Sequence, residues 1–336
     1  MLGVITYSTP SAKALTQVVL DNYNVGLVMD CRFLSRGLND TFLILTKESQ
    51  YILRIYRAGW RDHSDILFEL EALLHLAREG ISVSIPIKRG DGELVGVIAA
   101  PEGPRHMVLF SYAAGKEPQY DMEAFASAYG RAVARVHAKS DTFHSVYERF
   151  ELNLNHLLDL PIQSILPFLS HRNEDDEYVT RLGEKLRRRL EDLPLESLEM
   201  GFCHGDFNTG NVHQEGENGM TFFDFDCCGV GWRAYDIAVF RWNSRLLEKD
   251  KEWWPSFLHG YRDERSLADI DIKATDVFVA IRHLWLLDLH IGIGRDAGYG
   301  FLNDRYFDRG LTFLRKWEAE FLEEESGFED ADRSSQ

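Results

Sequence analysis

The eight residues HGDFNTGN at 204–211 constrain this 336-residue chain more than any other segment. They are mostly polar or glycine, and they lie between two apolar runs, 198–203 and 220–225. Short apolar runs bounded by turn-forming residues are typical of buried strands. The chain is therefore predicted to fold with a polar loop held between two strands.

Three side chains near these strand ends have a spacing that suits catalysis. Asp206 and Asn211 are five residues apart, and Asp224 follows thirteen residues after Asn211. Phosphoryl transfer from ATP needs a carboxylate that orients and deprotonates the attacking hydroxyl, and oxygen ligands that hold Mg²⁺ at the phosphates. Asp206 fits the first role, and Asn211 and Asp224 fit the second. Either half alone would equally fit a turn with a solvated carboxylate, but the two halves together favour a phosphotransferase.

Composition indicates a globular protein of two lobes, because 336 residues with 45% hydrophobic and 27% charged residues suffice for two cores. The formal charge of −17 disfavours nucleic-acid binding, which depends on a basic surface. Charged residues and histidines interrupt the most apolar stretch, 277–293, so no membrane span is expected. The chain shows no secretory signal pattern and no CxxC or disulfide spacing, which favours a cytoplasmic protein.

The first third of the chain predicts an antiparallel sheet with one helix. That helix begins at a Ser64 cap, has apolar residues at helical spacing, and stops at Gly80. Apolar or β-branched runs between turn-prone segments are the predicted strands: 31–34, 41–46, 51–56, 93–100 and 105–111.

Helices predominate after a short connection at 112–118. They are predicted from Asp121 onward and over 153–160, 176–190, 235–247, 251–261, 272–291 and 304–325. The expected organisation is a β-rich lobe at 1–112, a helical lobe at 113–326 and an acidic, disordered tail at 327–336.

These motifs and their order resemble the aminoglycoside phosphotransferase/choline kinase-like family over residues 33–321. Within that family the chain looks most like the branch of type II homoserine kinases and YihE-like stress-response kinases. The resemblance implies an α+β, bilobal protein-kinase-like fold, with ATP and Mg²⁺ as cofactors. It is most specific in the segments 51–57, 69–76, 130–138, 202–212 and 222–238.

By position, the resemblance makes Asp206 the catalytic base and Asn211 and Asp224 the Mg²⁺ ligands. Asp226 is a candidate for a metal or substrate contact. Two further residues are expected to support the catalytic loop rather than to react: His204 and Asp236.

The resemblance also places nucleotide contacts in the first lobe. Arg54, in the segment YILRIYR, occupies the position of the usual phosphate-binding cation. The turn that contains Ser35 and Gly37 is expected to cover the phosphates. The connection at Tyr112 and Ala113 is expected to lie against adenine.

Two more expectations concern the partner of Arg54 and the neighbouring residue Arg57. Glu69 and Glu71 lie on opposite margins of the helix's apolar stripe, so periodicity does not choose its partner, and the family pattern favours Glu71. Strand alternation places Arg57 on the face opposite Arg54, where it is expected to be exposed.

Acceptor recognition is less defined. Only eleven residues separate Asp224 from Asp236, which leaves no room for the long activation segment of a protein kinase. The favoured acceptor is therefore a small-molecule hydroxyl, on an amino alcohol or on a homoserine-like or aminoglycoside-like compound. A Ser/Thr protein kinase and a non-catalytic kinase-like binding protein remain alternatives, and the oligomeric state stays open.

Substrate contacts are expected from the helices after residue 235. In the alternative reading, the tryptophans are core residues and the arginines pair with acidic neighbours. The candidates are Arg241, Arg282, Trp285 and Asp288.

Overall fold

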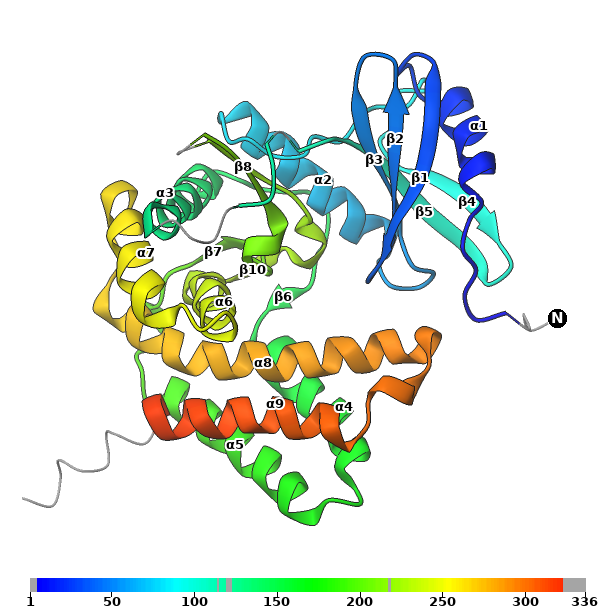
Figure 1. The fold of residues 1–336 in the computed structure, drawn as a ribbon. Coiled ribbons are helices and arrows are strands. Elements are labelled where there is room, and N and C mark those ends of the chain that lie inside the picture. Colours follow the sequence, from blue (N-terminus) through cyan, green and yellow to red (C-terminus); the bar gives the residue numbers. More distant parts are fainter. Residues whose placement is uncertain (1–4, 114, 119–122, 217–218, 323–336) are drawn as a thin grey trace, which may run out of the picture. The chain divides into compact units, whose positions relative to one another are not determined.

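The computed structural model describes residues 5–113, 115–118, 123–216 and 219–322 (Figure 1). The chain forms two compact units. The first comprises Met1–Phe150, Asn208–Gly229 and Pro255–Arg265. The second comprises Glu151–Phe207, Val230–Trp254 and Ser266–Gln336. The units therefore divide the chain differently from the predicted lobe boundary at 112/113, and the predicted tail at 327–336 lies outside the described residues.

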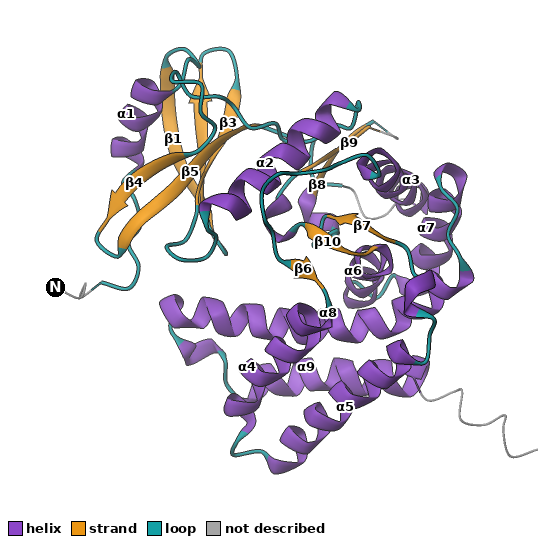
Figure 2. Ribbon diagram, turned by 180° about the vertical axis from the view of Figure 1, so that it is seen from behind, coloured by secondary structure: helices purple, strands orange, loops and turns teal. Residues whose placement is uncertain are grey.

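A five-stranded antiparallel sheet forms the centre of the first unit, as the sequence predicts, with the order β1-β2-β3-β5-β4 (Figure 2). Alternation along β2 buries Phe42 and Ile44 on one face. The strands are β1 (Val28–Arg36), β2 (Asp40–Thr46), β3 (Gln50–Ile55), β4 (Gly96–Ala100) and β5 (Gly103–Ser111).

A helix that the sequence did not predict, α1 (Ala12–Asn22), packs against this sheet. Leu15 and Val19 lie one helical turn apart and are buried in the same cluster as Phe42 and Ile44. The other residues of the helix are partly or fully exposed, and its N-cap residue, Ser11, makes no capping hydrogen bond with its side chain. The local signal for this helix is therefore weak, and packing on the sheet stabilises it.

Helix α2 (His63–Arg78) begins with a capping box. The Asp65 N–H donates to the Asp62 carboxylate at 2.8 Å, and the Asp62 N–H donates back to Asp65 at 3.3 Å. The predicted Ser64 cap is therefore wrong, because an acid two residues earlier satisfies the first-turn donors. Ser64 instead donates to the Glu148 carbonyl at 3.0 Å.

Several segments beyond residue 113 belong to the first unit, where hydrogen bonds join them to its earlier part and to one another. The Phe222 N–H donates to the Ser82 carbonyl and the Ser84 N–H donates to the Phe222 carbonyl, each at 3.0 Å. Lys116 and Gln214 exchange two backbone hydrogen bonds, at 3.0 and 2.7 Å. Gly130 lies against the backbone of Phe257, where a Cβ would come within 2.2 Å of the carbonyl oxygen. These elements are α3 (Glu123–Ser140), the hairpin of β8 (Val212–Glu215) and β9 (Gly219–Phe222), and the 255–264 part of α7 (Asp250–Glu264).

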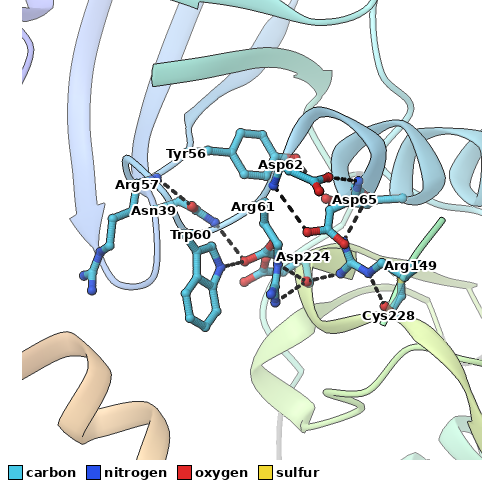
Figure 3. A network of polar contacts seen from close by, with 12 residues as sticks. Asn39, Tyr56, Arg57, Trp60, Arg61, Asp62, Asp65, Arg149, Asp224 and Cys228 are labelled. Atoms are coloured by element: carbon cyan, nitrogen blue, oxygen red, sulfur yellow. Dashed lines mark hydrogen bonds and ion pairs between the residues drawn. The ribbon is translucent and has the colours of Figure 1, made fainter. Parts of the chain in front are cut away.

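A buried polar network fixes the loop that follows β9. The Asp226 carboxylate accepts hydrogen bonds from Asn39 Nδ2 at 3.1 Å, Trp60 Nε1 at 2.8 Å and Arg61 Nε at 3.0 Å. Arg149 donates to the Asp226 backbone carbonyl at 2.5 Å. Figure 3 shows these donors converging from separate segments. Each carboxylate oxygen is thus hydrogen-bonded inside the unit.

This network keeps Asp226 ionised although it is only 1% exposed. Burial alone would raise the pKa of Asp226, but the neighbouring Arg61, Arg54 and Arg149 outweigh it and lower that pKa to about 2. A buried charge with several hydrogen-bonded partners is the arrangement that folded proteins tolerate.

Helices dominate the second unit (Figures 1 and 2). They are α4 (Leu160–Leu169), α5 (Asn173–Glu191), α6 (Arg233–Leu246), α8 (Asp269–Ala297) and α9 (Asp304–Trp317). A small sheet adds β6 (Glu151–Leu152), β10 (Gly229–Trp232) and β7 (Met200–Cys203). Most of these helices confirm the predicted ranges. The predicted helix at 153–160 is instead a single π-turn, Asn155–Asp159, that leads into the unpredicted α4.

Helix α8 is the core helix of the second unit and packs against α6. By length and hydropathy it meets the criterion for a membrane span, but 67% of its most apolar window is buried inside the protein. Packing therefore accounts for its apolar character.

The first prediction concerns the capping box. Asp62→Ala is expected to lower the free energy of unfolding by about 1 kcal/mol, because the Asp65 N–H loses its acceptor. Asp62→Asn is the matched control, since asparagine caps nearly as well as aspartate. Chemical denaturation should rank the alanine variant below the asparagine variant, and equal stability would contradict the capping role.

The second prediction concerns Asp226. Asp226→Asn should lower the free energy of unfolding by about 3 kcal/mol at pH 7, because a buried ion pair loses one partner. The folded pKa of about 2 lies below the unfolded value. The stabilisation is therefore complete above about pH 4 and disappears as the pH falls through about 2.

Denaturation measured from neutral to acid pH should thus show a difference between wild type and variant that shrinks toward low pH. A constant difference would contradict the assignment. Asp30→Asn is the control, because its ion pair with Arg32 is exposed and should contribute at most about 1 kcal/mol.

Candidate active site

A cavity of about 460 Å³ lies within the first unit. Its walls come from the turn between β1 and β2, from strands β3 and β5, from the connection after β5, and from the β8–β9 hairpin with the loop that follows it. Five of the predicted nucleotide contacts line it together: Ser35, Gly37, Arg54, Tyr112 and Ala113. Apolar side chains, among them Ile52 and Phe110, line the same space.

Arg57 contacts the glycine turn that lines this cavity. Its Nη2 donates to the Gly37 carbonyl at 3.1 Å, and its N–H donates to Asn39 Oδ1 at 3.2 Å. Arg57 is 8% exposed, so the prediction of an exposed edge residue is wrong. Because Asn39 also donates to Asp226, the same side chain connects the turn to the loop after β9.

The two terminal nitrogens of the Arg54 guanidinium contact two different carboxylates. Its Nη1 lies 2.6 Å from Glu69 Oε1, and its Nη2 lies 2.9 Å from Asp224 Oδ1. The predicted partner Glu71 is therefore wrong, and its side chain accepts a hydrogen bond from Ser145 at 2.6 Å. Glu69 lies on the buried face of α2. Glu71, two residues further along the helix, lies on a different face.

The electrostatics of the pair follow from complete burial. Burial raises the pKa of Glu69, and the Arg54 charge opposes this effect. Burial would lower the pKa of Arg54, but Glu69 holds it well above its usual range. Tyr56 donates to the second Glu69 oxygen at 2.8 Å, and the Phe110 ring lies 4.9 Å from the guanidinium. The guanidinium is thus fixed as a cation facing the cavity.

Asp224 has a strained backbone and an accessible carboxylate. Its φ of 64° and ψ of 58° are left-handed, and among the described non-glycine residues it shares a positive φ with Glu248 alone. Such conformations cost about 1–3 kcal/mol and cluster at functional sites. The side chain is 49% exposed and lines the cavity.

Asn211 lies beside Asp224 through backbone pairing. Its carbonyl accepts the Phe223 N–H at 3.1 Å, so the residue before Asp224 is opposite Asn211. Within the described ranges, no group of three or more His, Cys, Asp or Glu could hold a metal. One carboxylate and one amide suit a Mg²⁺ ion whose other ligands are phosphate and water. The predicted metal or substrate role of Asp226 is wrong, because its carboxylate is buried in the network of Figure 3.

In the second unit, a set of backbone contacts shapes the loop that carries Asp206. Asp236 accepts the N–H groups of His204 and Gly205, each at 2.7 Å. His204 Nδ1 accepts the Asp206 N–H at 3.2 Å. These contacts are of the kind that the expected supporting roles of His204 and Asp236 require. Gly205 has a φ of 77°, which a residue with a side chain rarely adopts.

The predicted substrate residues lie mostly inside the second unit. Arg241 forms an ion pair with Asp276 and stacks near Trp317, so its predicted substrate contact is wrong. Arg282 pairs with Asp206, which also supports the alternative that the arginines satisfy acidic groups of the chain. Trp285 is 6% exposed and packs over that arginine.

Asp288 is the remaining candidate. It is half-buried, and burial raises the pKa of its carboxyl.

Residues 30–270 match the APH family, a phosphotransferase enzyme family. An uncharacterised protein of Deinococcus radiodurans is 37% identical over 94% of this chain and 95% of its own length. The homoserine kinase of Agrobacterium fabrum is 27% identical over 76% of this chain and 77% of its own length.

Solved structures agree on the fold. The amicoumacin kinase hAmiN, in complex with AMP-PNP, Ca²⁺ and Ami, has a TM-score of 0.74 at 22% identity and covers 93% of both chains. The microcompartment-associated aminopropanol kinase has a TM-score of 0.70 at 24% identity, covering 91% of this chain and 95% of its own. The predicted α+β kinase-like fold is thus confirmed. With the family match over residues 30–270, it follows that the chain belongs to the APH phosphotransferase family and is a kinase.

Proposed function

We propose that this kinase transfers the γ-phosphoryl group of Mg·ATP to a hydroxyl of a small molecule that also carries an amine. The observation that carries this proposal is the composition of the cavity in the first unit. It combines a fixed arginine, a glycine turn and an accessible carboxylate: Arg54, Gly37 and Asp224. Phosphates require positive charge and backbone donors, and a metal requires oxygen ligands.

The nucleotide contacts divide by chemistry. The apolar part of the cavity, with Ile52 and Phe110, suits a purine base next to the connection at Tyr112 and Ala113. Arg54 and the glycine turn suit the phosphates. Asp224 and Asn211 would hold Mg²⁺, which when bound neutralises charge on the phosphate oxygens.

Asp206 would act on the acceptor. Its carboxylate is 21% exposed, so it is accessible to a ligand. It would orient the attacking hydroxyl and take up its proton as the bond to phosphorus forms. Asp236 and His204 hold the backbone on which this carboxylate stands. Orientation of this kind supplies much of the rate in phosphoryl transfer.

The net charge and the named relatives support this acceptor class. The kinases named for homoserine and aminopropanol act on alcohols that bear an amine, which is protonated at neutral pH. The net charge of −17 of this chain would attract such a cation. Asp288, a half-buried carboxylate on α8, is a candidate contact for the ammonium group.

The third prediction tests the reaction. ADP formation from Mg·ATP should be stimulated by one or more of L-homoserine, 1-amino-2-propanol, choline and kanamycin, and not by casein. Asp206→Asn should lower kcat by about 10³-fold, because the base is lost, and leave the Kd of Mg·AMP-PNP nearly unchanged. Asp276→Asn is the control, because it also removes an arginine-paired carboxylate from the second unit.

Three outcomes would contradict the proposal. Stimulation by casein alone would identify a protein kinase. Absence of Mg·AMP-PNP binding, together with no stimulation, would identify a non-catalytic binding protein. Unchanged turnover in Asp206→Asn would reject Asp206 as the base.

A further inference from the structure

An arginine from a helix later in the chain contacts the loop that carries Asp206. Arg282 lies on α8, 76 residues further along the chain, and is 2% exposed. Its Nη2 pairs with Asp206 Oδ1, and its Nη1 donates to the Gly205 carbonyl at 3.3 Å. The same guanidinium therefore contacts both the carboxylate and the backbone of the loop.

The guanidinium is itself held between aromatic rings. Its central carbon lies 5.0 Å from the centre of the Trp242 ring and 4.7 Å from that of Trp285. Trp242 Nε1 donates to His283 Nδ1 at 3.0 Å, which fixes that ring in turn. Cation–π contacts of this kind stabilise a buried guanidinium. The fork of Arg282 thus has one defined orientation before any substrate arrives.

The other loop contacts act on different atoms. Asp236 accepts backbone N–H groups at His204 and Gly205, and His204 accepts the backbone N–H of Asp206. These contacts act on the main chain of the loop. The Arg282 contact acts on the carboxylate itself.

We propose that Arg282 is the positioning residue for Asp206, holding its carboxylate in the orientation in which it meets the acceptor hydroxyl. This inference rests on the proposed function and adds a residue to it. It replaces the expectation that Arg282 binds a carboxylated substrate, because both terminal nitrogens contact the loop.

The rotation of one carboxylate has a large effect on rate. A displacement of about 1 Å at a reacting group costs about 10²-fold. A lysine has a single nitrogen on a flexible stem and cannot contact the carboxylate and the Gly205 carbonyl with a fixed fork. Nucleotide binding should be unaffected, because the residues that line the cavity of the first unit include none from α8.

The fourth prediction compares two arginines. Arg282→Lys should lower kcat by about 10²-fold while the KM for ATP changes by less than about twofold, with the best acceptor among L-homoserine, 1-amino-2-propanol and choline. Arg241→Lys is the matched control. Arg241 is also buried and stacked on aromatic rings, but it pairs with Asp276 and Asp250. The Arg241→Lys variant should be less stable than the wild type and should keep its kcat within about threefold.

Chemical rescue separates positioning from a structural role. Arg282→Ala leaves a space between two indole rings that can bind a small planar cation. Low millimolar guanidinium should therefore restore part of kcat in Arg282→Ala, whereas urea of similar shape should not, and Arg241→Ala should not respond to either. Thermal unfolding of each variant shows that the protein is folded under the assay conditions.

Three results would overturn the inference: wild-type kcat in Arg282→Lys, an equal loss in Arg241→Lys, or absence of rescue by guanidinium. Failure of the proposed function would appear differently, as absence of acceptor-stimulated turnover in the wild type, and the inference would fall with it.

Discussion

Arg54 is the side chain on which the first unit's candidate site depends. It extends from strand β3, pairs with Glu69 of helix α2 and reaches Asp224 in the loop after β9. Removing a cation and a carboxylate from water costs several kcal/mol per ion, and good geometry with further hydrogen bonds must offset that cost. Tyr56 and Phe110 supply the additional contacts. This charged group thus connects the sheet, the helix and the loop.

The two acids of the Asp224-Phe225-Asp226 motif have opposite environments. Asp224 is strained and 49% exposed, and it faces the cavity. Asp226 is 1% exposed and faces inward to Asn39, Trp60 and Arg61. Inward anchoring of the second acid holds the short turn in place, and this stabilises the strained backbone that presents the first. Asp226 therefore has a structural role, whereas the Asp224 carboxylate is exposed to a ligand in the cavity.

Much of the architecture could be predicted because it is local. Strand alternation, helical periodicity and the spacing of the acidic and amide residues are properties of short windows, and they indicate the antiparallel sheet, most helices and the loop of Asp206. Helix α1 was missed because only Leu15 and Val19 are buried along it. Helix α4 contains two prolines, Pro161 and Pro167, and proline usually indicates the end of a helix. Pro161, however, stands in the opening turn of α4, where proline is tolerated.

Most of the errors in the site concern partners that packing selects. Glu69 and Glu71 are equivalent in periodicity, and only the packing of α2 shows which one meets Arg54. Arg57 was expected to be exposed because alternation cannot foresee a side chain that folds back onto Gly37. The contact of Arg282 with Asp206 joins residues 76 apart, for which the sequence carries no local signal.

Asp224, paired with Arg54, is the group that we propose makes the cavity of the first unit a site for a metal–nucleotide complex. Calorimetric titration with AMP-PNP, in Mg²⁺ and in EDTA, compares the wild type, Asp224→Asn and the control Asp91→Asn. Asp91 is likewise a half-exposed carboxylate of the first unit that pairs with an arginine. AMP-PNP should bind more tightly with Mg²⁺ than with EDTA in the wild type and the control, and this difference should disappear in Asp224→Asn. An unchanged effect of Mg²⁺ in Asp224→Asn would contradict it.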